Sequence, residues 1–155
     1  MFMAGVEVEI TGLDDVVNRL QRLANPRRTK SIARKASRQA MNIVRDVARN
    51  NAKAIDDPET SEKIFKNIKV SAGKTRNPNE IVMRVGVDGG ASFSNPNPKP
   101  TSGGDTRHWR WIEYGKSGVP AVPFMRPALA NNIQQVTNKF AEIFDAELDK
   151  ELANL

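Results

Sequence analysis

The sequence predicts an α+β fold in which a small antiparallel β-sheet packs with a long basic helix in the N-terminal half and with a C-terminal helix. Apolar residues recur at helical spacing over about 29–55 and again over about 127–152. Between these segments, residues 68–88 have the composition of two strands joined by a turn. The chain has 155 residues, which fits a single domain over residues 1–155 with one core.

The first 25 residues predict a strand and a short helix. Residues 6–10 (VEVEI) alternate apolar and charged side chains, as a half-buried strand does, and Thr11 and Gly12 end it. The following LDDVVNRLQRL has leucines and valines at helical spacing. Two aspartates lie in its first turn, where the helix dipole favours acidic groups. Asn25 and Pro26 end this helix.

A long, two-faced helix is expected next, from Thr29 as its N-cap to about Ile55, with Pro58 beyond its end. At about 100° per residue, one arc of this helix is apolar and rich in alanine, and the opposite side is basic. The apolar arc holds Ile32, Ala36, Ala40, Ile43 and Val47, and the basic side holds Arg34, Arg38, Arg45, Arg49 and Lys53.

The basic side of this helix has two interpretations, a solvated face or a surface that contacts DNA phosphates or an acidic partner. Residues 26–53 contain nine basic residues and one acidic residue, and like charges four positions apart repel on a helix. The whole chain carries a formal net charge of +6, which favours an acidic partner. Residues 141–155 reverse the balance with five acidic residues against Lys150, so copies of the chain can attract one another head to tail.

The middle of the chain predicts a helical turn, a β-hairpin and a long loop. Residues 61–67 fit one turn of helix, and 68–73 and 80–88 are interpreted as the strands of a hairpin. Residues 89–105 are too poor in apolar side chains to order alone, so a flexible loop is expected that is either functional or disordered. A third strand is expected at HWRWIEYG, with Trp109, Trp111 and Glu113 on one face.

Nothing in the sequence indicates catalysis, a metal site or a cofactor. The chain has no cysteine, and the common nucleophile, zinc, phosphate-loop and calcium motifs do not occur. His108 is the only histidine, and on a strand it points away from Glu113, five residues later, which removes an acid–base pair. No apolar run approaches the length of a membrane span, and the charged N-terminal stretch is unlike a secretory signal.

The segment 108–129 concentrates both tryptophans, the only tyrosine and three of the nine prolines. Pro120 and Pro123 forbid helix and favour a stiff, extended path, and Pro127 fits the first turn of the final helix. The segment is interpreted as a rigid connection that docks the last helix, as an interface, or as both. The final helix carries one apolar stripe, formed by Leu129, Ile133, Val136, Phe140, Ile143, Phe144 and Leu148.

The run WIEYGKSGVPAVPFMRPAL resembles the signature of the tail-completion or neck proteins of long-tailed bacteriophages. Lys116 stands where that family usually has threonine. Weaker likenesses are GLDDVVNRLQRL before a basic, alanine-rich helix, and SEKIFKNI, in which Ser61, Glu62 and Asn67 replace the family's Thr, Gly and Ser. The residues that match the signature are Trp111, Glu113, Tyr114, Gly115, Pro120, Ala121, Pro123, Phe124, Arg126, Pro127 and Ala128.

This resemblance implies a structural virion protein, made in the host cytoplasm, that forms or completes a ring joining the tail to the capsid connector and lets DNA pass. It implies an α+β protomer without catalysis. The implied partners are further copies in a ring, with a hexamer as one candidate order, other phage neck and tail proteins, and phage DNA in the lumen, with no membrane.

Two sets of contact residues follow from these interpretations. The basic helix also supports an alternative function, a free DNA-binding protein without sequence preference. Its expected contacts with DNA or an acidic partner are Arg34, Arg38, Arg45, Arg49 and Lys53. The expected protein-interface residues are Trp109, Trp111, Glu113, Tyr114, Gly115, Pro120, Pro123, Phe124, Arg126 and Pro127.

Overall fold

The computed structural model describes residues 13–155, and in that range it confirms the α+β class, with six helices and one two-stranded sheet. The strand expected at 6–10 lies outside the described residues. No helix within 13–155 is long and apolar enough to cross a membrane. In chain order the elements are α1 (Leu13–Leu23), α2 (Pro26–Ala54), α3 (Ile64–Asn67), β1 (Ile68–Ala72), β2 (Met83–Val87), α4 (Trp109–Tyr114), α5 (Arg126–Ala130) and α6 (Ile133–Ala153).

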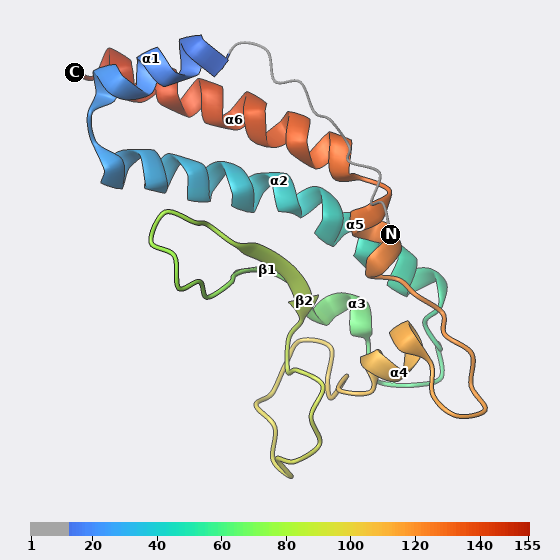
Figure 1. The fold of residues 1–155 in the computed structure, drawn as a ribbon. Coiled ribbons are helices and arrows are strands. Elements are labelled where there is room, and N and C mark those ends of the chain that lie inside the picture. Colours follow the sequence, from blue (N-terminus) through green and yellow to red (C-terminus); the bar gives the residue numbers. More distant parts are fainter. Residues whose placement is uncertain (1–12) are drawn as a thin grey trace, which may run out of the picture.

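Helix α2 is the middle layer of the fold, with α6 along one side and the β1–β2 hairpin on the other (Figure 1). Because α6 runs antiparallel to α2, the end of α6 lies beside the start of α2, and α1 packs on α6 there. The predicted hairpin is confirmed. Its register pairs Ile68 with Val87 and Val70 with Val85, and this face of the sheet packs on α2.

Helix α2 begins earlier than expected. Its N-cap is Asn25 and not Thr29, because Asn25 Oδ1 accepts the backbone N–H of Arg28 at 3.2 Å. Pro26 occupies the first turn, where a backbone N–H has no helical partner in any case. Thr29 donates its hydroxyl to the carbonyl of Asn25 at 3.2 Å, so it supports the cap from within the helix.

The buried stripe of α2 winds around the helix instead of keeping to one arc. Residues four apart are displaced by about 40° per step, so a stripe with this spacing turns steadily around the axis. It faces α6 in the first half of α2 and the sheet in the second. The expected arc is therefore correct as far as Ala40 and wrong beyond it, where Ile43 and Val47 are only half-buried. The buried residues are Ile32, Ala36, Ala40, Val44, Ala48 and Ala52.

Two apolar clusters form the core of the described residues. The larger lies between the second half of α2, the hairpin and the start of α5, and includes the fully buried Phe124 and Ile68. The smaller joins α1, α2 and α6 through Leu23, Ile32 and Leu148. Burying one large apolar side chain contributes roughly 1.5–3 kcal/mol, so Phe124 fixes the segment before α5 firmly to the core.

The third strand expected at 108–115 is wrong, because this segment forms the short helix α4. Both faces of the segment carry large side chains, so alternation could not separate a strand from a helix. In α4 the inward side chains lie three and four residues apart, and the outward ones are exposed. The inward residues are Trp109, Ile112 and Glu113, and the outward ones are Arg110, Trp111 and Tyr114.

His108 occupies the N-cap position of α4, where its side chain makes no capping hydrogen bond. The strand geometry that separated His108 from Glu113 therefore does not exist. Glu113 is instead fully buried and turned toward α5. Within residues 13–155, no group of three or more His, Asp or Glu side chains is placed to hold a metal ion.

The expected final helix is divided into α5 and α6 by Asn131 and Asn132. Asn132 Nδ2 donates to the carbonyl of Ala128 at 2.8 Å, and this bond satisfies a carbonyl in the last turn of α5. The predicted apolar stripe is only partly buried as a result. Its residues range from the fully buried Leu148 to Ile133, which is 59% exposed.

Candidate functional site

The carboxylate of Glu113 joins α4 to the start of α5. It is fully buried, and Oε2 accepts the backbone N–H of Phe124 at 2.7 Å and that of Met125 at 2.9 Å. Oε1 accepts the backbone N–H of Arg126 at 2.9 Å. These three donors precede or begin α5, so one side chain satisfies amides that have no helical partner. The acidic residue of the signature is thus a structural anchor.

The exposed side chain of Arg126 also binds Glu113. Its Nε donates to Glu113 Oε1 at 3.1 Å, and its Nη2 donates to the Glu113 carbonyl at 2.7 Å. The guanidinium also lies over the ring of Tyr114, 4.6 Å from the centroid. Burial raises the pKa of the Glu113 carboxyl, but the three backbone N–H groups and the Arg126 side chain lower it by more. The pKa of the Glu113 carboxyl therefore lies below its ordinary value, and the carboxylate stays ionised.

Acidification is expected to destabilise the protein through these carboxylates. Contact with Arg107 lowers the pKa of Asp105 to about 2, and the pKa of Glu113 is also lowered. A depressed folded-state pKa contributes stability above the unfolded-state pKa, and that stability is lost as pH falls through the folded-state value. The thermal midpoint should therefore hold from pH 7 to 5 and drop from about pH 4.5 to 2. A midpoint that rises on acidification would contradict this. The variant Asp105→Asn should show a shallower drop.

Gly115 allows the chain to fold back after α4. Its φ is +75°, and a Cβ there would lie 2.9 Å from both the backbone nitrogen of Ala121 and the carbonyl oxygen of Val119. The Val122 N–H then donates to the Ile112 carbonyl at 2.7 Å, so the extended proline segment runs back along α4. Only glycine fits this position without strain, which accounts for the glycine of the signature.

An exposed stack of aromatic rings and cations lies on the outer side of α4. The rings of Phe93 and Trp111 are stacked at 5.2 Å with an interplanar angle of 17°. Arg107 lies 4.7 Å from the centroid of Phe93, and Lys116 lies 4.7 Å from that of Trp111. Phe93 and Trp111 are 49% and 46% exposed, and Tyr114 is 55% exposed. We call this the α4 surface, and define it as Phe93, Arg110, Trp111, Tyr114 and Lys116.

The loop 89–105, which supplies Phe93, is held by the buried side chain of Asn67. Asn67 Nδ2 donates to Thr106 Oγ1 at 2.7 Å and to the Gly104 carbonyl at 3.1 Å, and Oδ1 accepts the N–H of Gly103 at 2.7 Å. Gly103 leaves no room for a side chain, because a Cβ would lie 2.1 Å from the Lys63 carbonyl oxygen. This anchor could not be predicted from local sequence patterns, because the partners of Asn67 lie more than 30 residues away.

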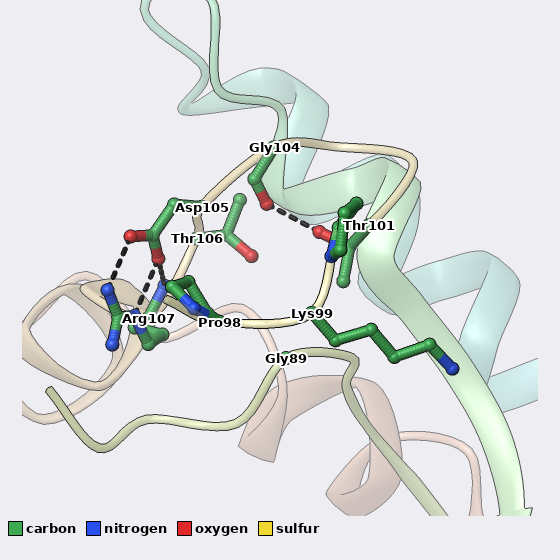
Figure 2. Close-up of a pocket in the computed structure, with 9 residues that line it drawn as sticks. Gly89, Pro98, Lys99, Thr101, Gly104, Asp105, Thr106 and Arg107 are labelled. Atoms are coloured by element: carbon green, nitrogen blue, oxygen red, sulfur yellow. Dashed lines mark hydrogen bonds and ion pairs between the residues drawn. The ribbon is translucent and has the colours of Figure 1, made fainter. Parts of the chain in front are cut away.

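Arg107 holds the other half of the loop. Figure 2 shows its guanidinium on Asp105, where Nη2 and Oδ2 are 2.7 Å apart. Its Nη1 donates to the Ser92 carbonyl at 3.1 Å and to the Asn95 carbonyl at 2.7 Å. The cavity in Figure 2 has a volume of about 200 Å³ and is lined by Pro98, Lys99, Pro100 and their neighbours. We assign it no ligand, because the charges of Asp105 and Arg107 in its wall already pair with each other.

The expected interface residues fall into three groups. Glu113 and Phe124 lie inside the chain, so they can serve an interface only by holding its shape. Trp109, Gly115 and Pro127 are half-buried, and Trp109 Nε1 donates to the Gly90 carbonyl at 3.0 Å. The exposed group is Trp111, Tyr114, Pro120, Pro123 and Arg126.

The five expected DNA-contact residues do not share one free face. Arg45 pairs with the neighbouring Asp46 at 2.8 Å, and Arg49 donates twice to the Ile68 carbonyl, at 2.8 and 3.1 Å. Lys53 lies over the ring of Phe65. These three lie in the second half of α2, where the buried stripe has turned toward the sheet. The structure leaves two of the five exposed together, Arg34 and Arg38.

The opposite charges of the basic and acidic segments meet within one chain. Lys35 pairs with Glu147 at 2.9 Å, and Arg28 pairs with Glu151 at 3.3 Å, where the start of α2 meets the end of α6. Arg19 of α1 reaches three aspartates, and its Nη1 lies 2.7 Å from Asp149. The acidic end of α6 is therefore largely engaged by the chain's own basic residues, which weakens the argument for head-to-tail attraction through it.

Comparison with known proteins identifies a family. The model described as "Bacteriophage HK97-gp10, putative tail-component" matches residues 14–115, which run from α1 to the glycine after α4 and include Asn67 and Glu113. No curated protein and no solved structure gives a significant match. The description assigns the family to the phage tail, and so to the virion. Because the match covers more than half of the chain, this protein belongs to the HK97-gp10-like family of bacteriophage tail components.

Proposed function

We propose that this protein forms or completes a ring at the end of the phage tail, where it joins the tail to the capsid connector and lets DNA pass. Membership of a phage tail family supports a structural role. The signature over residues 111–129, which resembles that of tail-completion and neck proteins, favours the junction over other parts of the tail.

The α4 surface carries the proposal. Its three aromatic side chains are about half-exposed, and they lie beside two cations, Arg110 and Lys116, that make no ion pair within residues 13–155. Trp, Tyr and Arg are the residues that most often dominate the binding energy of protein interfaces. Glu113 and Gly115 fix the backbone around this surface, so little conformational freedom is lost when a partner binds.

The stack on α4 favours a protein partner over an unpaired nucleic-acid base. Phe93 and Trp111 cover one face of each other, and Arg107 and Lys116 cover the remaining faces. A base needs a free ring face on which to stack. The α4 surface instead offers ring edges, the Tyr114 side chain and the cations of Arg110 and Lys116, which suit a partner that presents apolar side chains and carboxylates.

The double variant Tyr114→Ala, Arg110→Glu is expected to fold normally and to fail in assembly. Both side chains point outward, and Trp111 keeps its stack with Phe93. Loss of one interface hot spot reduces binding by about 30-fold or more, so joining of heads to tails that lack the wild-type protein should fall at least tenfold. Electron microscopy and light scattering of the purified protein, alone and mixed with such tails, measure this.

A matched control is Val17→Ala, Arg22→Glu, which changes an exposed apolar and an exposed basic side chain on α1. It should assemble like the wild type. If the double variant joins tails as well as this control does, the α4 surface is not the interface. A wild-type protein that neither forms rings nor rescues tails lacking it rules out the junction role altogether.

A further inference from the structure

The connection between β1 and β2 lies along the first half of α2 (Figure 1). Lys30 Nζ donates to the carbonyl of Pro78 near the tip of this connection, which ties the hairpin to the helix. A cleft of about 320 Å³ separates the two elements and is lined by Lys30, Arg34 and residues of the hairpin, Gly73 and Thr75 among them. The hairpin connection is therefore held beside the first half of α2.

Both elements carry exposed basic side chains. We call this set the hairpin surface, and define it as Arg34 and Arg38 of α2 with Lys74, Arg76 and Arg84 of the hairpin, all exposed. None of the five forms an ion pair with an acidic side chain of residues 13–155, in contrast to Arg28, Lys35 and Arg45. The hairpin connection has one carboxylate, Glu80, which accepts the Thr75 hydroxyl at 2.6 Å.

The hairpin geometry turns basic groups outward. In the register of the sheet, Arg84 is paired with Ser71, on the face opposite to the one that packs on α2. Gly73 makes room for it, because a Cβ there would lie 2.9 Å from Arg84 Nε. Arg34 and Arg38 lie one turn apart on α2, about 6 Å along the axis. Free cations are thus spread over both elements instead of being concentrated in one pocket.

We infer that the hairpin surface contacts the phosphates of double-stranded DNA without reading its sequence. An extended surface of free Lys and Arg is the electrostatic footprint of backbone contact. An acidic protein partner is less well matched, because protein interfaces need an apolar centre and the exposed aromatic residues lie on the α4 surface instead. The inference rests on the proposed function only in that DNA passes this protein. Of the expected contacts on α2 it keeps Arg34 and Arg38, and it adds the basic residues of the hairpin.

Binding of a fluorescein-labelled duplex of arbitrary sequence to the purified full-length protein tests the inference. Five phosphate contacts give a slope of about −4.5 in log affinity against log salt, so affinity should fall about 500-fold between 50 and 200 mM salt. The variant Arg34→Glu, Lys74→Glu, Arg76→Glu should reduce the slope to about −1.8, a fall of about 12-fold. The control Arg22→Glu, Lys139→Glu, Lys150→Glu changes the net charge equally on α1 and α6 and should keep the wild-type slope.

Three outcomes would overturn the inference. The first is no binding of duplex at 50 mM salt, and the second is an equal loss of affinity in the variant and the control. The third is unchanged DNA binding with lost tail joining, which would assign the hairpin surface to an acidic protein. If tails join through the α4 surface but the hairpin variant binds DNA like the wild type, the proposed function stands and this inference fails. If heads and tails join without the protein, the proposed function fails, and DNA binding by the hairpin surface can still hold.

Discussion

Replacing Glu113 with glutamine is expected to lower the free energy of unfolding by about 2–4 kcal/mol, because a buried donor loses its acceptor and the remaining hydrogen bonds lose the charge of the carboxylate. The carboxylate is fully buried and accepts three backbone N–H groups and one guanidinium N–H. Glutamine keeps the shape, but its NH₂ group must face at least one of these donors. One buried N–H then loses its acceptor, which accounts for about 1–3 kcal/mol of this effect.

Thermal unfolding followed by circular dichroism measures this effect, which should lower the midpoint by about 10 °C. The matched control is Glu142→Gln on α6, where the same chemical change affects a side chain that is 71% exposed and pairs with Lys139 at 3.5 Å. Its effect should stay within about 0.5 kcal/mol. Equal midpoints for the two variants would show that Glu113 does not anchor α5, and the account of the signature would fail with it.

The parts of the fold that depend on neighbouring residues could be predicted from the sequence. Helical periodicity identified α1 and α2, and strand-like composition around a turn-rich connection identified the hairpin, because these are local patterns. The N-cap at Asn25 was missed because two capping residues, Asn25 and Thr29, stand one turn apart and the helical pattern alone does not choose between them. The strand predicted at 108–115 was wrong for a different reason. Large side chains lie on both faces of this segment, so the alternation of apolar and polar residues that identifies a strand is absent.

The candidate site could be located but not explained from the sequence. Trp111, Tyr114 and Gly115 stood out by composition and by resemblance, and the first two are exposed as an interface requires. The role of Glu113 could not be predicted, because its donors lie 11 to 13 residues later, across a turn whose path depends on Gly115. The expected DNA contacts assumed a straight stripe on α2, whereas the buried face of that helix winds, and Arg45, Arg49 and Lys53 contact other residues of the chain.

Replacing Asn67 with alanine is expected to release the loop 89–105 and to lower the free energy of unfolding by about 2–4 kcal/mol. The side chain is fully buried, and alanine leaves the Gly103 N–H without its acceptor and Thr106 Oγ1 without its donor. An unsatisfied buried polar group costs about 1–3 kcal/mol. The loop contains 17 residues from 89 to 105 and no helix or strand, so few other contacts restrain its first half besides those of Arg107.

Hydrogen exchange and limited proteolysis distinguish this loop release from general unfolding. In Asn67→Ala, amides of residues 89–105 should exchange and be cleaved at least tenfold faster, while α2 and α6 keep their protection, because local opening needs less free energy than global unfolding. Asn97→Ala, at an exposed asparagine of the same loop, should behave like the wild type. Since Phe93 of this loop stacks on Trp111, the Asn67 variant should also impair tail joining. A loop that stays protected without Asn67 would mean that Arg107 alone holds Phe93 in the α4 surface.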